Sequence, residues 1–322
     1  MPVISVLMAV RDAGQFLDDA IASVLAQTLG DFELIVVDDG SVDRSPEMLA
    51  GWVTKDARVR AVRRESRGLA AALNHAAALA RGSYLARHDA DDLSHPERFA
   101  RQHARLEREP DLAALGSAVD VLDADGVVGG ALPVAHGRAA VRRGITTGRV
   151  TPVHGAMMMR RGALERVGGY REAFRVSQDF DLWLRVLETG AEIDNLPEPL
   201  YRWRRHPDNV TATQRALQFQ SAAVMLVFAE ERRRRGADGY ADLVAAEGDV
   251  ELFAARYRER GRLYALWGEM LYRGFGSARL GRRHLLRALR NGYATPRSLA
   301  LLAWALCGLP WPTGAAVRSE AA

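Results

Sequence analysis

The sequence is poor in cysteine, because Cys307 is the only one among its 322 residues. A single cysteine excludes an internal disulfide framework and any metal site built from several cysteines. It fits a reducing compartment best. The first ten residues also lack the basic start, long apolar run and cleavage site of a secretory signal. We therefore expect a cytoplasmic protein.

Long hydrophobic runs are absent as well. The most apolar segment, Ser298 to Leu309, falls well short of the ~20 residues that a membrane-spanning helix needs. We expect a buried or interfacial helix there instead. Any contact with the inner face of a membrane would then be peripheral.

Neither sign of charge is in large excess, since the formal net charge is +4. The sequence pI of about 9.5 reflects arginine, which clusters late in the chain at Arg232 to Arg235 and at Arg282-Arg283. Such clusters are ordinarily solvated helical faces. Contact with an anionic membrane surface or a pyrophosphate-bearing acceptor is the alternative. We expect no nucleic-acid partner, because no nucleic-acid-binding motif accompanies the charge.

What is present is ordinary for a globular protein, with 48% hydrophobic and 26% charged residues. The first third alternates predicted strands with predicted helices that begin near Leu17, Ser45 and Leu69. The predicted strands are Val3 to Val10, Phe32 to Val37, Val59 to Val62 and Tyr84 to His88. This alternation predicts an α/β fold with a doubly wound, mainly parallel sheet.

The remainder of the chain changes character. Val119 to Leu122 and Leu200 to Trp203 are predicted as short strands, and Phe180 to Leu187 as a helix. From about Thr211 the pattern is helical almost to the end. We therefore predict two domains, a catalytic domain of residues 1–212 and a helical C-terminal region of residues 213–322.

Acidic residues follow two of the predicted strands, as Asp38-Asp39 and as Asp89-Ala90-Asp91-Asp92. Ligands of parallel sheets bind beyond the carboxyl ends of the strands. In extended backbone, Asp89 and Asp91 would face the same side and could hold Mg²⁺ or Mn²⁺. Such a cation would keep open positions for a diphosphate. The alternative is a solvated acidic turn before the helix that Pro96 begins.

The other acidic motifs each have two interpretations. Asp38 and Asp39 could accept hydrogen bonds from a nucleoside, or form a turn that caps the next helix. Asp179 opens the predicted helix in Gln178-Asp179-Phe180-Asp181. It could be a simple N-cap, or a general base that deprotonates an acceptor hydroxyl.

Several stretches together resemble the bacterial family 2 glycosyltransferases with the GT-A fold. The likeness extends over residues 3–210, in order and at familiar spacing. The matching stretches are Ser5 to Arg11, Ile35 to Asp43, Arg67 to Asn74, Arg87 to Asp92, Gln178 to Arg185 and Tyr201 to His206. The sequence departs from the common pattern at Gln178, where a glutamate usually precedes the base.

The resemblance implies a role for each matching residue. Asp179 would be the catalytic base. Asp91 would be the main metal ligand, and Asp89 would contact ribose or a metal-bound water. The remaining donor-binding residues would be Ala9 and Arg11 in the nucleoside pocket, Asp39 on the base, Asp38 on the ribose side, Arg67 and Gly68 near the nucleotide, Asn74 bracing that loop, and Arg202 and His206 over the diphosphate.

The reaction that this resemblance implies is an inverting, metal-dependent transfer of a sugar from a nucleotide sugar, with a UDP-sugar as the first donor to test. The acceptor would be a saccharide or a lipid-linked sugar in surface polysaccharide or glycolipid synthesis. Two alternatives stay open, a sugar nucleotidyltransferase and a non-catalytic nucleotide-sugar sensor or assembly subunit. A nicotinamide-dependent dehydrogenase is disfavoured, because no G-x-G-x-x-G follows the first strand.

Overall fold

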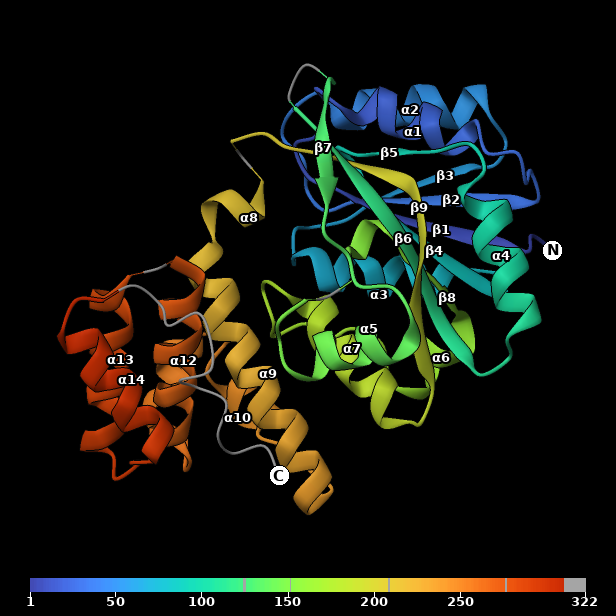
Figure 1. The fold of residues 1–322 in the computed structure, drawn as a ribbon. Coiled ribbons are helices and arrows are strands. Elements are labelled where there is room, and N and C mark those ends of the chain that lie inside the picture. The colour runs from blue at the N-terminus through green and yellow to red at the C-terminus, as the bar shows by residue number, and fades with distance from the viewer. Residues whose placement is uncertain (124–125, 151, 208, 276, 310–322) are drawn as a thin grey trace. The chain divides into compact units, whose positions relative to one another are not determined.

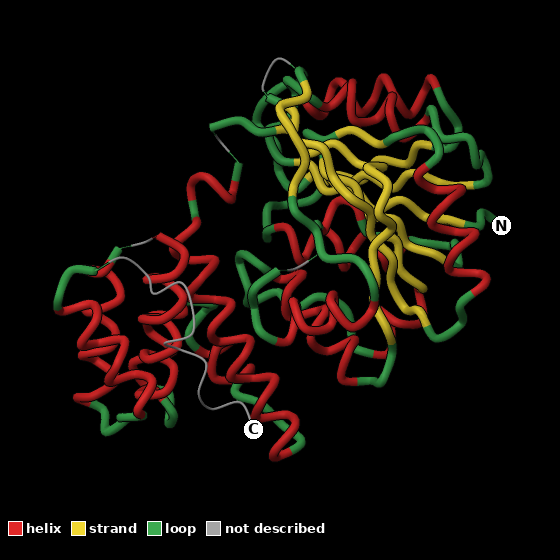
Figure 2. Tube along the Cα trace, in the orientation of Figure 1, coloured by secondary structure: helices red, strands yellow, loops and turns green. Residues whose placement is uncertain are grey.

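The computed structural model describes residues 1–123, 126–150, 152–207, 209–275 and 277–309. The chain divides into two compact units, Met1–Asn209 and Val210–Ala322. Within the described residues, strands occur only in the first unit, and the second is helical (Figures 1 and 2). The boundary predicted at residue 212 lies within α8 (Val210–Thr213).

One sheet forms the centre of the first unit. Among the described residues it has nine strands, with eight in the order β3-β2-β1-β4-β8-β6-β9-β5 and β7 paired to β6. The strands are β1 (Ile4–Val10), β2 (Phe32–Asp38), β3 (Val59–Arg63), β4 (Tyr84–Asp89), β5 (Leu93–Ser94), β6 (Leu112–Leu122), β7 (Val128–Leu132), β8 (Met158–Arg160) and β9 (Glu192–Arg204). Strands β1 to β4 are parallel to one another, and β6 is parallel to β9.

Helices cover both faces of the parallel part (Figure 1). Those of the first unit are α1 (Leu17–Leu25), α2 (Ser45–Lys55), α3 (Leu69–Leu79), α4 (Arg98–Arg108), α5 (Arg138–Thr146), the 3₁₀ turn η1 (His154–Ala156), α6 (Arg161–Arg166) and α7 (Gln178–Glu188). Helices α1 and α2 lie on one face and α3 lies on the other. The predicted α/β class with a doubly wound, mainly parallel sheet is confirmed.

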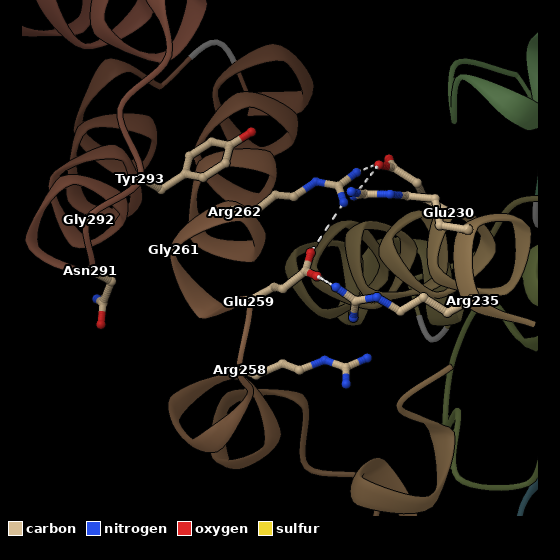
Figure 3. A pocket seen from close by; sticks show the side chains of 10 residues that line it. Glu230, Arg235, Arg258, Glu259, Gly261, Arg262, Asn291, Gly292 and Tyr293 are labelled. Atoms are coloured by element: carbon tan, nitrogen blue, oxygen red, sulfur yellow. Dashed lines mark hydrogen bonds and ion pairs between the residues drawn. The ribbon is translucent and has the colours of Figure 1, made fainter. Parts of the chain in front are cut away.

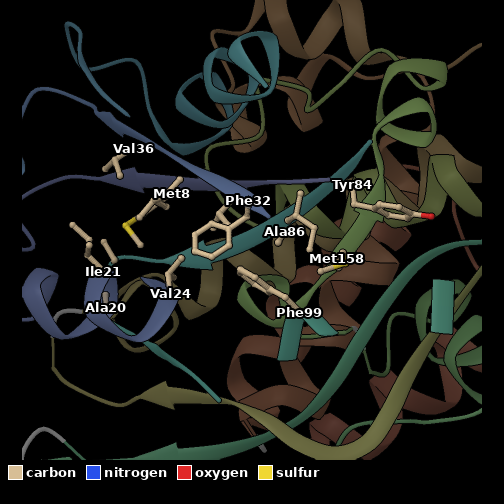
Figure 4. Close-up of a cluster of buried hydrophobic side chains, with 14 of the residues drawn as sticks. Met8, Ala20, Ile21, Val24, Phe32, Val36, Tyr84, Ala86, Phe99 and Met158 are labelled. Atoms are coloured by element: carbon tan, nitrogen blue, oxygen red, sulfur yellow. The ribbon is translucent and has the colours of Figure 1, made fainter. Parts of the chain in front are cut away.

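The core of this unit explains why the strand sequences are apolar throughout. Alternate residues of β1, among them Met8, pack with Ile21 and Val24 of α1 and with Phe99 of α4 (Figure 4). All four side chains are fully buried. Helix α3 covers the opposite face of β1 and β2, so neither face of these strands meets water. The strands are thereby fixed in register, which fixes where their carboxyl ends lie.

The second unit is a set of helices that bury their own apolar side chains, Phe228 and Trp267 among them. The helices are α8, α9 (Arg215–Arg235), α10 (Tyr240–Ala245), α11 (Val250–Arg256), α12 (Arg260–Phe275), α13 (Ala278–Arg290) and α14 (Pro296–Leu306). Leu285 of α13 packs against Leu301 and Leu302 of α14. None of the helices in the described ranges is both long and apolar enough to cross a bilayer.

Candidate active site

The parallel register brings the predicted residues of three strands to one edge of the sheet. Val10 pairs with Asp38 on one side, and Ala9 pairs with Asp89 on the other. These residues are the last of their strands or next to it. The acidic ends of β2 and β4 therefore flank the end of β1, which is where ligands of such sheets bind.

Asp39 organises the loop before α3. Its carboxylate accepts the backbone N–H of Arg67 at 3.0 Å, the backbone N–H of Gly68 at 2.8 Å and the hydroxyl of Ser66 at 3.1 Å. The guanidinium of Arg11 donates in turn to Ser66 Oγ at 2.8 Å. Four residues predicted to bind the donor, Arg11, Asp39, Arg67 and Gly68, are thus joined in one hydrogen-bonded cluster.

Asp38 is almost fully buried and shapes the turn that follows β2. Its Oδ1 accepts the backbone N–H of Ser41 at 2.8 Å, and its Oδ2 lies 3.4 Å from Nε of Arg63. Gly40 in this turn has a φ of +79°, and a Cβ there would lie 3.1 Å from the backbone nitrogen of Ser66. Asp38 therefore holds the acidic turn against the neighbouring loop, and its contact with ribose stays a prediction.

The turn after β4 holds three carboxylates in different surroundings. The strand ends at Asp89, and residues 90 and 91 form a turn. Asp92 is buried and accepts the Tyr201 hydroxyl at 2.7 Å and the backbone N–H of Arg204 at 2.8 Å. Burial raises the pKa of Asp92 well above its ordinary value, and the charges of Asp91 and Asp89 add to the effect.

Asp91 faces a histidine from the segment after β9. Its Oδ2 lies 3.0 Å from Nε2 of His206 and 3.3 Å from the amide nitrogen of Asn209. Asn209 also accepts the backbone N–H of His206 at 2.7 Å, which fixes this short segment. The ring of Phe16 lies 5.0 Å from the His206 ring, centroid to centroid. A carboxylate and an imidazole therefore meet at the edge of the sheet.

Two buried arginines balance the acidic turn. Arg87, 4% exposed, forms an ion pair with Asp89. Arg98 is fully buried and donates to the carbonyl of Arg87 at 2.6 Å and to the carbonyl of Gly155 at 3.0 Å. Its guanidinium lies over the ring of Tyr201, 5.1 Å from the centroid. These cations tie β4, α4, η1 and β9 together behind the carboxylates.

Asp179 lies at the amino end of α7, one residue after the helix begins. Burial raises its pKa from 3.8 to about 6, and the charge of Asp89 adds to the rise while the backbone N–H of Phe180 and the charge of Arg87 oppose it. The pKa of Asp179 therefore responds to two charged groups of the acidic turn, Asp89 and Arg87. A carboxylate with such a pKa is ionised at neutral pH and basic enough to accept a proton.

Its neighbour Asp181 has a structural role. It is fully buried and accepts Nε of Arg185 at 2.8 Å, and Arg171 lies 3.5 Å away. Arg185 also donates to the carbonyls of Val167 and Gly169. Asp181 therefore holds the start of α7 against the preceding loop, whereas Asp179 has no such ion pair among the described residues.

Comparison with known proteins settles the family. A model described as Glycosyl transferase family 2 matches residues 5–168, slightly more than half of the chain. EpsE of Bacillus subtilis, which is assigned as a glycosyltransferase, is 35% identical over 213 residues, covering 64% of this chain and 74% of EpsE. The O-antigen biosynthesis glycosyltransferase WbnJ of Escherichia coli is 30% identical over 226 residues, covering 69% of this chain and 87% of WbnJ. This chain belongs to glycosyltransferase family 2.

Solved structures agree on the fold of this family 2 enzyme. The crystal structure of S. aureus TarS 1-349 in complex with UDP superposes with a TM-score of 0.61 at 14% identity, covering 97% of this chain and 93% of the TarS 1-349 chain. The mannosyltransferase PcManGT from Pyrobaculum calidifontis, in complex with GDP-Man and Mn²⁺, gives a TM-score of 0.57 at 19% identity, covering 95% of this chain and 80% of PcManGT. The predicted GT-A fold and the glycosyltransferase class are confirmed.

The structure corrects the expected geometry of Asp89 and Asp91 in this glycosyltransferase. The prediction that they face one side assumed extended backbone, but the chain turns after Asp89. Asp89 consequently pairs with Arg87, and Asp91 with His206. The two carboxylates therefore contact different partners, and the arrangement singles out Asp91 as the carboxylate beside the histidine.

For Arg202 the contact with the diphosphate stays a prediction. Arg202 pairs with Leu93 at the edge of the sheet and its side chain is exposed. Arg204 contacts the acidic turn, since its Nε donates to the carbonyl of Asp91 at 3.0 Å. The motif between Tyr201 and His206 has three arginines, and sequence alone could not tell which one the strand turns inward.

Asn74 braces a different segment from the one expected. Its amide oxygen accepts the backbone N–H of Tyr170 at 2.8 Å, and its nitrogen donates to the Tyr170 carbonyl at 2.9 Å. It also reaches Glu172, which forms an ion pair with Arg67 at 3.3 Å. Asn74 therefore supports the segment that precedes α7, and Glu172 links that segment to the loop of Arg67.

Sequence reasoning missed a buried pair near Asp179. His154 Nε2 lies 2.8 Å from the hydroxyl of Tyr170. Burial lowers the pKa of His154 well below its ordinary value, which keeps the ring neutral. Gly155 follows it, and a Cβ there would lie 2.6 Å from Asp89 Oδ2 and 2.2 Å from the Tyr201 hydroxyl. Only a glycine fits between these two groups, and no local sequence pattern predicts this constraint.

Proposed function

We propose that this glycosyltransferase moves a sugar from a nucleotide sugar to an acceptor hydroxyl in one displacement, with inversion at the anomeric carbon. The observation that carries the proposal is the partly buried Asp179, whose pKa is raised to about 6 and responds to the charge of Asp89 at the end of β4. One proposed base acting on one proposed donor site favours a single displacement. Asp179 would take the proton of the acceptor hydroxyl as its oxygen attacks.

The nucleotide would bind at the ends of β1 and β2. The cluster of Arg11, Ser66 and Asp39 lies there with the backbone of Arg67 and Gly68. Asp39 is only 4% exposed and its oxygens already accept three donors. We infer that Asp39 contributes to binding of the nucleobase through this loop as much as by direct contact.

A divalent cation fits the pair formed by Asp91 and His206. A carboxylate oxygen and an imidazole nitrogen, here 3.0 Å apart, are ligand atoms that Mn²⁺ binds. The side-chain amide of Asn209 lies beside them. No group of three or more acidic, histidine or cysteine residues suited to a metal occurs among the described residues. A cation held by two protein ligands would keep positions for the diphosphate, whose charge it would neutralise. Mg²⁺ is the other candidate.

The names of similar proteins suggest the donor and the process. TarS has been solved with UDP and with UDP-GlcNAc, and PcManGT with GDP-Man and Mn²⁺. WbnJ is named for O-antigen biosynthesis, and AmsE of Erwinia amylovora, 28% identical over 206 residues, for amylovoran biosynthesis. We propose a UDP-sugar as donor and a saccharide or lipid-linked sugar as acceptor, in the synthesis of a surface polysaccharide or glycolipid in the cytoplasm.

Replacing the base tests this proposal. With Asp179→Asn, we expect turnover to fall by about 10²- to 10⁴-fold, the usual contribution of a positioned base, while the affinity for UDP stays within twofold, about the precision of such a comparison. The measurement is release of UDP from a panel of UDP-sugars with Mn²⁺ and candidate saccharide acceptors. Glu188→Gln is the matched control, because Glu188 is an exposed carboxylate at the other end of α7.

Retained turnover in Asp179→Asn would remove Asp179 from the role of base. A wild-type protein that binds UDP but releases none from any donor would favour the sensor or assembly subunit. Equal losses in Glu188→Gln would show that charge on α7, rather than the position of Asp179, decides the rate.

A further inference from the structure

Charge is segregated in the second unit. From residue 270 to residue 309 the chain has seven arginines and no aspartate or glutamate. The formal net charge of the whole protein is only +4, so this stretch is more cationic than the chain that contains it. It comprises the end of α12 together with α13 and α14.

The other arginine cluster of this unit differs, because its cations have acidic partners. Arg235 of α9 lies 3.0 Å from Glu259, and Arg262 of α12 forms ion pairs with Glu230 and Glu259 (Figure 3). These residues line a cavity of about 580 Å³. Each of the four arginines that line it, Arg234, Arg235, Arg258 and Arg262, forms an ion pair with a glutamate, which weakens its attraction for an outside anion.

The arginines of α13 form an uncompensated row. Arg279, Arg282, Arg283 and Arg290 are exposed, and at 100° per residue they project within a narrow arc of the helix. None of the four has an ion pair in the part of the chain that the structure describes. Leu286 projects from the same arc and packs against the core that α13 shares with α14. The arginine row therefore borders α14.

Helix α14 turns an apolar face outward. Its inner face buries Leu301, Leu302 and Ala305. On the outer side Leu299 is 46% exposed, Trp304 37% and Leu306 57%, and Leu309 after the helix is 39% exposed. Arg297 is the only charged residue of α14. A solvent-facing helical surface without charges beyond its first turn is unusual for a helix that meets only water.

We propose that α13 and α14 bind the surface of an anionic lipid bilayer. Exposed leucines on one helix, next to arginines on its neighbour, match the interfacial layer of a membrane, where apolar side chains enter and cations meet lipid phosphates. The positive charge of the arginine row favours an anionic bilayer over a second copy of this chain as the partner. A two-fold contact through α14 would bring two arginine rows together without acidic residues to separate them.

The proposal concerns residues of the second unit and is independent of the proposed sugar transfer. The bilayer would place the protein where lipid-linked acceptors are held. The two proposals fail separately, because vesicle binding is measured without donor and UDP release is measured without vesicles.

The single cysteine supplies the probe for the test. Cys307 is exposed at the end of α14, so a polarity-sensitive fluorophore attached to its thiol reports on that helix alone. The full chain is mixed with vesicles of phosphatidylcholine, or of phosphatidylcholine with phosphatidylglycerol. We expect the emission to shift to the blue with anionic vesicles only, and the shift to weaken as salt screens the charges. Binding of unlabelled protein is measured in parallel by vesicle flotation.

Two variants locate the surface. Combining Arg279→Gln, Arg282→Gln, Arg283→Gln and Arg290→Gln should weaken binding to anionic vesicles by roughly 10²-fold or more, given the usual contribution of each basic residue near such a surface. Combining Leu299→Ser and Leu306→Ser should weaken the binding that remains at high salt. The matched control removes four exposed arginines of the first unit, by Arg108→Gln, Arg143→Gln, Arg149→Gln and Arg166→Gln.

The control should bind as the wild type does, although its net charge equals that of the α13 variant. Unfolding midpoints confirm that all variants are folded. The proposal is overturned if wild type binds neither kind of vesicle, or if the control loses as much binding as the α13 variant. A dimer in sedimentation that Leu299→Ser with Leu306→Ser dissociates, without vesicle binding by wild type, would assign the face to a second copy instead.

Discussion

At the scale of single residues, Asp179 combines a proposed catalytic role with a cost to stability. Its pKa is raised from 3.8 to about 6 by burial. A raised acid pKa means that the folded state holds the proton more tightly than the unfolded state does. Folding is therefore favoured most below the unfolded pKa, and this contribution is lost as pH rises through the folded pKa.

The pH dependence of stability gives a direct prediction for this residue. Above pH ~7, Asp179→Asn should be more stable than wild type by about 1–2 kcal/mol, which allows for partial solvent screening of the carboxylate, and the difference should vanish below pH ~4. Urea unfolding at both pH values measures it. An asparagine variant that is no more stable at neutral pH would show that Asp179 is not held in a destabilising environment.

Single residues also show what the sequence could and could not predict about the site. The motif order marked Asp39, Asp91, Asp179 and His206 as site candidates, because a carboxylate after a buried strand or at a helix start has a local signature. It could not show that Arg204 bonds the acidic turn, since the direction of a side chain at the end of β9 depends on the register with β6 and β5. His154 and Gly155 have roles that arise only from contacts distant in the chain.

At the scale of elements, β9 holds the acidic turn through one hydroxyl. Tyr201 donates to Asp92 at 2.7 Å and accepts the backbone N–H of Asp89 at 3.1 Å. We expect Tyr201→Phe to lower the free energy of unfolding by about 1–3 kcal/mol, because it leaves buried polar groups unpaired, and to weaken UDP binding that depends on this turn. Chemical denaturation and UDP titration measure the two effects.

Tyr264→Phe in α12 makes the same chemical change and is the matched control. The Tyr264 hydroxyl has no hydrogen bond among the described residues, so its loss should change stability by less than about 0.5 kcal/mol. Equal losses in the two variants would contradict the assignment of the hydroxyl of Tyr201 as the bridge between β4 and β9.

The elements themselves were predictable to different degrees. β1 to β4 and their helices have continuous apolar runs and clear turns, so their order was evident. β6 and β9 were predicted only as the short pieces Val119 to Leu122 and Leu200 to Trp203, but extend over Leu112–Leu122 and Glu192–Arg204. β9 contains two prolines and several charged residues, which disfavour a strand in isolation. Pairing with β6 overrides that preference, with register shifts along the ladder.

At the scale of the whole molecule, the chain separates two kinds of surface chemistry. Every residue placed here in donor binding or proton transfer lies in Met1–Asn209, whereas the exposed arginine row of α13 lies in the second unit. Fold class and family follow from the first unit. The role of the second could not be predicted from sequence, because the partners of each arginine appear only once the helices are packed.

Thermal unfolding of the full chain with UDP, with and without Mn²⁺, tests the central claim most directly, since a ligand that binds only the folded state raises its stability. At UDP a hundredfold above the dissociation constant, we expect a gain of about 2.7 kcal/mol. The increase in stability with UDP should require Mn²⁺ or Mg²⁺. In Asp91→Asn, UDP should leave the unfolding midpoint of the variant unchanged. No rise with UDP, dTDP or GDP, or an equal rise in Asp91→Asn, would contradict a metal-dependent nucleotide-sugar site at the end of β4.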